Sequence, residues 1–280
     1  MNQFEQFQNV LNLEQKSESV FCFEPDTNYF VGQTPHGGYL MAMMHRALVS
    51  VLPHSCAINS NVLYLDRTEP ELVELHVESF KIGKGTSSGQ VKLMQRGRIN
   101  CTFTALCSDL DKLDGYSDIA TPLPEIFHTC SENDCITMNY DNVQKGFTPS
   151  FIQQLNLSVH PDHTWWLKKD FDRTSEARCS GYIELDGGLP DQFALSYFSD
   201  ILPPVVTNKY GPIGWIPTLS LTTNIRQLPV TRKLFIDGIA KDLKNGFFEQ
   251  DCSIWDLNGS LVATSRQLAK ILKSNEKLNT

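Results

Sequence analysis

A long apolar helix followed directly by a run of strands is the feature that most constrains the fold of this chain. The stretch Pro35-His-Gly-Gly-Tyr-Leu opens a segment in which apolar residues recur at helical spacing as far as Val51. Four strand candidates follow without another helix, at residues 56–66, 71–82, 86–96 and 99–109. One helix covers that many strands only if the sheet curls around it. The first half is therefore expected to wrap a curled antiparallel sheet around a central helix.

The same order of elements returns in the second half of the chain. Strand-like runs at 151–159 and 178–185 precede a Gly-Gly turn and a helix expected over 190–202. Four further strand candidates follow, at residues 216–228, 233–243, 247–257 and 260–272. The turn Arg96-Gly97-Arg98 in the first half corresponds to Asn258-Gly259-Ser260 in the second. This repeat predicts an α+β protein made of two fused hotdog domains, each a curled antiparallel sheet around a long central helix.

The stretch between the two halves loses this pattern. Aspartates at positions 109, 111 and 114 lead into a proline-containing segment and then into the polar run Ser131-Glu-Asn-Asp. We therefore divide the chain into an N-terminal hotdog domain (1–112), a linker (113–147) with room for one edge element, and a C-terminal hotdog domain (148–280).

Composition argues against several classes of protein. The net charge of -8 disfavours a nucleic-acid surface, which needs clustered Lys and Arg. No apolar run approaches the roughly 18 residues of a membrane span. The N-terminus lacks the basic and apolar regions of a signal peptide, so a cytoplasmic protein is expected. The eight cysteines show neither CxxC pairs nor zinc spacing, which favours free thiols, and no metal or other cofactor is expected.

Four motifs, taken together and in this order, resemble the acyl-CoA thioesterase II family of the thioesterase-like superfamily. They are Pro35-His-Gly-Gly-Tyr-Leu, Asp200-Ile-Leu-Pro-Pro, Pro217-Thr-Leu-Ser-Leu-Thr and Trp255-Asp-Leu-Asn-Gly-Ser-Leu-Val-Ala-Thr-Ser-Arg-Gln. The resemblance extends from about residue 20 to residue 272 and implies a double hotdog that hydrolyses acyl-CoA to free acid and CoA. The family places its catalytic Asp, Thr and Gln at positions matched here by Asp200, Thr218 and Gln267.

These three residue types suit hydrolysis of a thioester. A carboxylate can accept a proton from water, and a Thr hydroxyl with a Gln amide can fix the orientation of that water. A carboxylate near a helix C-terminus is unfavourable with the helix dipole, and Asp200 has the apolar neighbours Phe198 and Ile201, so a functional reason is expected. The structural alternatives are an exposed helix residue for Asp200 and ordinary strand residues for Thr218 and Gln267.

The start of the first-half helix is expected to bind the substrate through His36, Gly37, Gly38 and Tyr39. Backbone N–H groups at a helix start can polarise a thioester carbonyl, and glycines let the backbone approach a ligand closely. A single His in a loop more often has a structural role, which is the alternative for His36. Arg96 and Arg98 lie beside a turn and could meet CoA phosphates, with ordinary surface charge as the alternative.

The expected function is therefore acyl-CoA hydrolysis in lipid metabolism, with one working site per chain in the second half. Unpaired sheet edges favour a homodimer or a higher homo-oligomer. Two other functions stay open: a non-catalytic protein that binds an acyl ligand, and a hotdog hydratase or dehydratase. The last would need a His–Asp pair, and the second half offers only His160 and His163, in a polar stretch.

Overall fold

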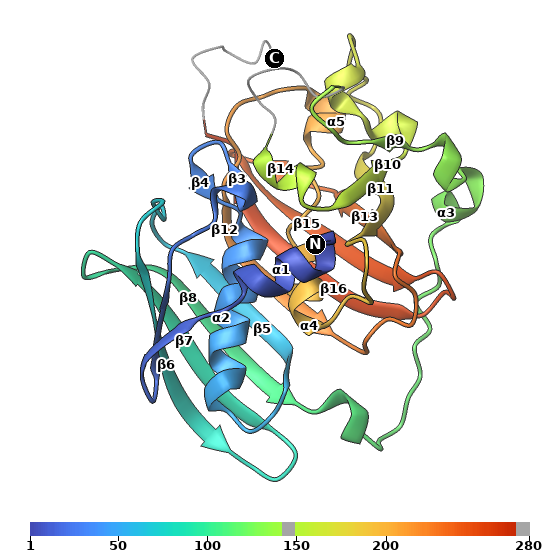
Figure 1. Cartoon of the computed structure of the whole chain (residues 1–280). Coiled ribbons are helices and arrows are strands. Elements are labelled where there is room, and N and C mark those ends of the chain that lie inside the picture. The colour runs from blue at the N-terminus through green and yellow to red at the C-terminus, as the bar shows by residue number, and fades with distance from the viewer. Residues whose placement is uncertain (142–148, 273–280) are drawn as a thin grey trace.

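The computed structural model describes residues 1–141 and 149–272, and its dominant feature is one large antiparallel sheet (Figure 1). The helices of this part of the chain are α1 (Gln3–Val10), α2 (Gly37–Val51), α3 (Glu125–Thr129), α4 (Gln192–Phe198) and α5 (Thr207–Tyr210). None of the helices in the described ranges is long and apolar enough to span a bilayer.

The strands of the first half are β1 (Glu14–Ser17), β2 (Val20–Phe23), β3 (Phe30–Val31), β4 (Thr34–Pro35), β5 (Cys56–Tyr64), β6 (Val73–Ile82), β7 (Ser87–Gln95) and β8 (Arg98–Ser108). Those of the second half are β9 (Ile136–Thr137), β10 (Asn156–Val159), β11 (Ala177–Glu184), β12 (Thr218–Ile225), β13 (Leu234–Ala240), β14 (Leu243–Lys244), β15 (Phe247–Asp256) and β16 (Leu261–Lys270). The four strands predicted after each apolar helix are thus confirmed.

The order of strands in the sheet joins the two halves edge to edge. It runs β1-β2-β6-β7-β8-β5-β12-β16-β15-β13-β11-β10-β9, with β14 paired to β15. The halves meet where β5 pairs with β12, and side-chain amides cross this junction: Asn59 donates to Asn224 over 2.8 Å and Asn61 donates to Thr222 over 2.9 Å. A continuous sheet leaves no exposed edge between the halves.

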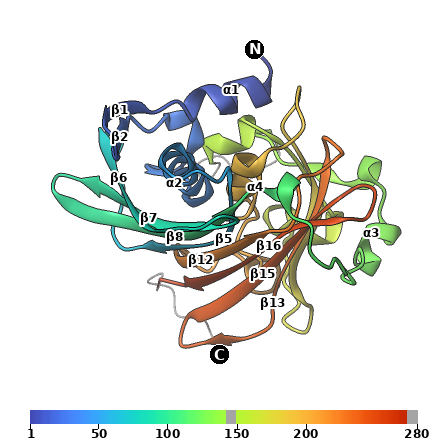
Figure 2. The same cartoon turned by 90° about the horizontal axis from the view of Figure 1, so that it is seen from below.

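The helix α2 lies against one face of this sheet and forms the centre of the hydrophobic core (Figure 2). It packs against β5, β6, β7 and β8 on one side and against α4 on another. Side chains are buried around almost its whole circumference, which confirms the predicted central helix; burial of each large apolar side chain contributes about 1.5–3 kcal/mol. The helix ends at Val51 because Pro53 follows, and a residue before proline avoids the helical region.

Two predicted elements of the second half differ from the structure. The helix expected over 190–202 is the shorter α4, which Asp191 caps by accepting from the backbone N–H groups of Phe193 and Ala194. It stops ahead of Pro203-Pro204, where a helix cannot continue. The strand expected over 151–159 begins as a 3-10 turn at Ser150–Gln153, and only β10 is extended.

A buried histidine ties α2 to its neighbours. The Nε2 atom of His45 accepts from the backbone N–H of Ala57 over 2.9 Å, so its Nδ1 carries the proton and donates to Ser196 Oγ over 2.9 Å. Ser196 in turn donates to the backbone carbonyl of Gln192 in α4. Burial lowers the pKa of His45 to about 3, so the ring is neutral at pH 7.

We expect His45→Leu to reduce the free energy of unfolding by about 2–4 kcal/mol, because it leaves the buried Ala57 N–H and Ser196 hydroxyl without their partner. The measurement is equilibrium unfolding in denaturant at pH 7.5. The matched control is His76→Leu on β6, where the side chain is 40% exposed and hydrogen-bonds to Glu74, and its expected change is within about 0.5 kcal/mol. Equal effects of the two substitutions would contradict this role of His45.

Candidate active site

The carboxylate of Asp200 lies where the end of α4 meets the start of α2. Asp200 is two residues past α4, and its side chain is only 10% exposed. Its Oδ2 accepts from the backbone N–H of Gly38 over 3.1 Å, and its backbone carbonyl is 3.0 Å from His36 Nε2. Asp200 therefore meets two residues that lie 162 and 164 positions earlier in the sequence. A helix N-terminus faces its carboxylate.

Glycine is required at the start of α2 because the two helices approach closely there. A Cβ atom on Gly37 would lie 2.5 Å from Asp200 Oδ2, and a Cβ on Gly38 would lie 2.4 Å from the backbone carbonyl of Tyr197. Real Cβ atoms do not come this near to other heavy atoms. The His-Gly-Gly motif thus allows the backbone of α2 to reach the carboxylate.

Thr218 and Gln267 complete a chain of polar side chains that starts at Asp200. Thr218 opens β12, and its Oγ1 is 2.9 Å from Gln267 Oε1 and 3.4 Å from Asp200 Oδ1. A hydroxyl has one proton to donate, and the shorter distance assigns it to Gln267. The Oγ1 atom of Thr218 therefore keeps its lone pairs free, and a donor that also reaches Asp200 can hydrogen-bond to them.

A β-bulge turns Thr218 into the site. Thr218 pairs with Ala269 and Leu221 pairs with Gln267, so three steps along β12 match two steps along β16. Strict alternation from the buried Leu221 would point Thr218 to the opposite face. The extra residue places both on the face that Gln267 and Ala269 share, as bulges near active sites often do.

Burial controls the protonation of the site. It raises the pKa of Asp200 from its usual value to about 7, against the opposing effect of the hydrogen bond from the backbone N–H of Gly38. Burial also lowers the pKa of His36 to about 4, so this ring is neutral at pH 7 and donates Nε2–H to the carbonyl of Asp200. The carboxylate is the group at this site that titrates near neutral pH.

Sequence reasoning missed one residue at the site, Tyr64. Its hydroxyl donates to the backbone carbonyl of Gly37 over 2.8 Å, and burial together with the charge of Asp200 raises its pKa well above the usual value. It is the last residue of β5 and was indistinguishable from other strand residues in the sequence. The packing of α2 against β5 brings it to the start of α2.

The predicted substrate-binding residues separate into two groups. His36, Gly37 and Gly38 surround Asp200, whereas the side chain of Tyr39 points into an aromatic cluster, stacked on Tyr29 with ring centroids 4.9 Å apart. Its hydroxyl accepts from the backbone N–H of Asp26 over 3.3 Å.

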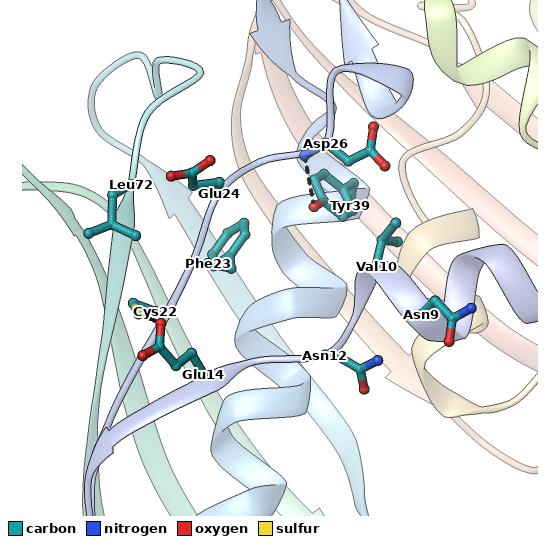
Figure 3. Close-up of a pocket in the computed structure, with 10 residues that line it drawn as sticks. All are labelled: Asn9, Val10, Asn12, Glu14, Cys22, Phe23, Glu24, Asp26, Tyr39 and Leu72. Carbon is teal, nitrogen blue, oxygen red and sulfur yellow. Dashed lines mark hydrogen bonds between the residues drawn. The ribbon is translucent and has the colours of Figure 1, made fainter.

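Tyr39 also borders a surface hollow of about 410 Å³ (Figure 3). The charged side chains that line this hollow are Glu14, Glu24 and Asp26. An acidic lining repels an anionic ligand. Asp200 is not among the residues that border it.

Known structures resemble this chain along almost its entire length. A Thermobifida fusca protein provisionally described as a thioesterase II superposes with a TM-score of 0.83 at 24% identity, covering 96% of this chain and 98% of that one. A hotdog-fold protein of unknown function from Alicyclobacillus acidocaldarius superposes with a TM-score of 0.80 at 19% identity, covering 96% and 98%. The chain therefore has a hotdog fold.

Sequence comparison gives the family. An uncharacterized Mycobacterium tuberculosis protein is 23% identical over 269 residues, which cover 90% of this chain and 91% of that protein. The family model for the acyl-CoA thioesterase N-terminal domain matches residues 25–108, and the model for the acyl-CoA thioesterase C-terminal domain matches residues 132–271. The second match spans Asp200, Thr218 and Gln267 and half of the chain. The chain belongs to the acyl-CoA thioesterase family.

Proposed function

We propose that this chain hydrolyses acyl-CoA to a free acid and CoA, with Asp200, Thr218 and Gln267 directing the attacking water. The observation that carries this proposal is the convergence of the three side chains, which come from the end of α4, the start of β12 and the middle of β16. The pKa of about 7 supports Asp200 as the base, because a general base is most effective when its pKa lies near the working pH.

In this mechanism the water stands to one side of Asp200 Oδ1 and Thr218 Oγ1, which are 3.4 Å apart, and bridges them. One of its protons points to Asp200 Oδ1 and the other to the lone pairs of Thr218 Oγ1, whose own proton is held by Gln267. This leaves a lone pair of the water free to attack the thioester carbonyl. As the C–O bond forms, Asp200 takes the proton; as the C–S bond breaks, Asp200 returns that proton to the leaving CoA thiolate. Asp200 is thus first base and then acid.

The start of α2 is the proposed site of the thioester carbonyl, bordered by His36, Gly37, Gly38 and Tyr39. The positive end of the helix dipole favours the oxygen on which negative charge develops. The N–H of Gly38 is donated to Asp200 Oδ2, so it primarily positions the base. The neighbouring N–H groups of the first helical turn, which lack intrahelical partners, then face the substrate. The acyl chain would lie in an apolar channel beside α2 and α4.

We further propose that the fold is a double hotdog: domains 1–112 and 148–280, joined by the linker 113–147, each with a curled sheet around its central helix. The strand order supports this division, because it places one half on each side of the β5–β12 junction. The turns that precede β8 and β16 support the repeat, since Gly97 and Gly259 both have positive φ, of 74° and 90°. The terminal strands β1 and β9 are the proposed edges for self-association of the chain.

We expect Asp200→Asn to reduce kcat by at least about 100-fold, because an amide cannot accept the proton of the water. The measurement is release of free CoA thiol from a panel of acyl-CoAs of increasing chain length, including aromatic acyl groups. The control is Asp242→Asn, a change of the same kind at an exposed position between β13 and β14, with unchanged turnover. Turnover that survives in Asp200→Asn would overturn the site; binding without turnover in the wild type would favour a protein that only binds acyl ligands.

The same assignment predicts a pH dependence. Because the active form of Asp200 is the carboxylate, with a pKa of about 7, kcat/KM should fall about tenfold per pH unit below pH 7 and level off above it. The substrate should be an acyl-N-acetylcysteamine thioester, which has no phosphate that titrates in this range. A flat profile from pH 5 to pH 8 would show that the base is not Asp200 or that its pKa is not raised.

A further inference from the structure

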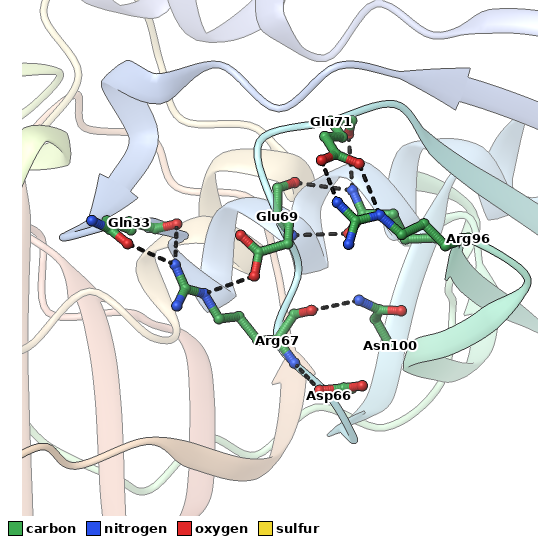
Figure 4. A network of polar contacts seen from close by, with 8 residues as sticks. Gln33, Asp66, Arg67, Glu69, Glu71, Arg96 and Asn100 are labelled. Carbon is green, nitrogen blue, oxygen red and sulfur yellow. Dashed lines mark hydrogen bonds and ion pairs between the residues drawn. The ribbon is translucent and has the colours of Figure 1, made fainter.

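A polar hollow of about 330 Å³ lies beside the turn that joins β7 to β8 (Figure 4). It is lined by Asp66, Arg67, Glu69, Gln95, Arg96, Arg98 and Asn100. Three of these residues are arginines and two, Asp66 and Glu69, are acidic. Its volume falls in the range of small-molecule sites, at its lower end.

Buried amides hold the walls of this hollow in place. Gln95, which is 6% exposed, donates to the backbone carbonyls of Glu69 and Glu71 over 3.0 Å and accepts from the N–H of Glu69 over 2.9 Å. Asn100, which is 4% exposed, donates to the carbonyl of Arg67. The segment 67–71 is therefore fixed against β7 and β8, so the arginines stand on a preorganised frame.

The three guanidinium groups differ in how they are paired. Arg96 binds both carboxylate oxygens of Glu71, and Arg67 is 3.3 Å from Glu69 Oε1. Arg98 forms no ion pair and no side-chain hydrogen bond with any residue in 1–141 or 149–272, although it is exposed. Ion pairs as exposed as that of Arg96 contribute little to stability, so an incoming phosphate can replace the carboxylate partners.

The hollow is connected to the proposed active site through two segments. Arg67 follows Tyr64 by three residues, a span of at most about 10 Å along the chain. Its Nη2 atom donates to the carbonyl of Gln33 over 3.1 Å, three residues before His36. A ligand bound in this hollow can therefore reach the start of α2 if it has an extended arm.

We propose that this hollow binds the 3′-phosphorylated ADP end of coenzyme A, while the pantetheine arm runs along Arg67 and Tyr64 to the thioester site. Arg98 offers an unpaired guanidinium to a phosphate, and Arg96 and Arg67 offer two more; Arg binds phosphate through two parallel hydrogen bonds. The acidic hollow beside Tyr39 would repel the same group. This inference rests on the proposed function, because it assigns the other end of the same substrate.

The first test measures binding without hydrolysis. Adenosine 3′,5′-bisphosphate is titrated into the full-length protein by calorimetry, with 5′-AMP as a second ligand to measure the contribution of the 3′-phosphate. Arg98→Gln, which breaks no contact in the described structure, should weaken binding of the bisphosphate about 5- to 10-fold. The double variant Arg96→Gln/Glu71→Gln, which leaves no unpaired carboxylate, should weaken it similarly.

The matched control is Arg266→Gln. Arg266 lies on β16. Like Arg96, its side chain is 65% exposed and binds both oxygens of a carboxylate, in this case that of Asp251. Its removal should leave binding of the bisphosphate unchanged. Arg98→Gln and Arg266→Gln change the net charge equally, so equal loss of binding in these two variants would reduce the effect of Arg98 to net charge and overturn the assignment.

The second test separates this inference from the proposed reaction. In Arg98→Gln, KM for acyl-CoA should rise about 5- to 10-fold with kcat unchanged, whereas KM for the acyl-N-acetylcysteamine thioester, which lacks the nucleotide, should stay the same. The bisphosphate should inhibit acyl-CoA hydrolysis competitively. Unchanged KM values with normal turnover would refute the nucleotide site alone. Absent turnover on every substrate would refute the reaction, while calorimetry still reports on the hollow.

Discussion

The arrangement of this protein depends on one carboxylate held out of water between two helices. Asp200 follows α4 and accepts a hydrogen bond from the first turn of α2. Withdrawal of a carboxylate from water disfavours its ionised form, and the hydrogen bond from the N–H of Gly38 offsets only part of that effect. The result is a group poised between base and acid near pH 7, as the proposed two-step proton transfer needs.

This carboxylate also explains why both halves of the chain are needed for one site. The first half supplies the Gly-Gly backbone, His36 and the hydroxyl of Tyr64, and the second half supplies Asp200, Thr218 and Gln267. The close approach of α2 and α4, secured by glycine and by the buried bond from His45 to Ser196, brings them together. In the sheet, the pairing of β5 with β12 holds the two halves in a fixed position relative to each other.

Most of the secondary structure could be predicted from the sequence, as could the meeting of Asp200, Thr218 and Gln267 in one place. The spacing of apolar residues located α2 and the strands, because the residues on the buried face of a helix or strand recur at a fixed interval in the sequence. Three features of the site could not. The bulge that turns Thr218 inward depends on the register with β16. The role of Tyr64 depends on its contact with Gly37, 27 residues away in the sequence. The end of α4 lies beside β16, where the hydroxyl of Ser265 donates to the carbonyl of Ser199. Each is set by tertiary contacts.

The most direct test of the buried carboxylate is the stability of Asp200→Asn relative to wild type as a function of pH. A folded-state pKa of about 7 lies above the ordinary value of 3.8, so the folded protein binds this proton more tightly than the unfolded chain does. Ionised Asp200 therefore destabilises the fold above pH 7, and this destabilisation diminishes as the pH falls toward 4. The Asn side chain carries no charge and can still accept from Gly38.

We expect Asp200→Asn to be more stable than wild type by about 2–4 kcal/mol at pH 8, measured by denaturant unfolding, and the difference to vanish near pH 4. A variant that is less stable than wild type at pH 8, or a difference that does not change with pH, would contradict a buried carboxylate with a raised pKa at this position.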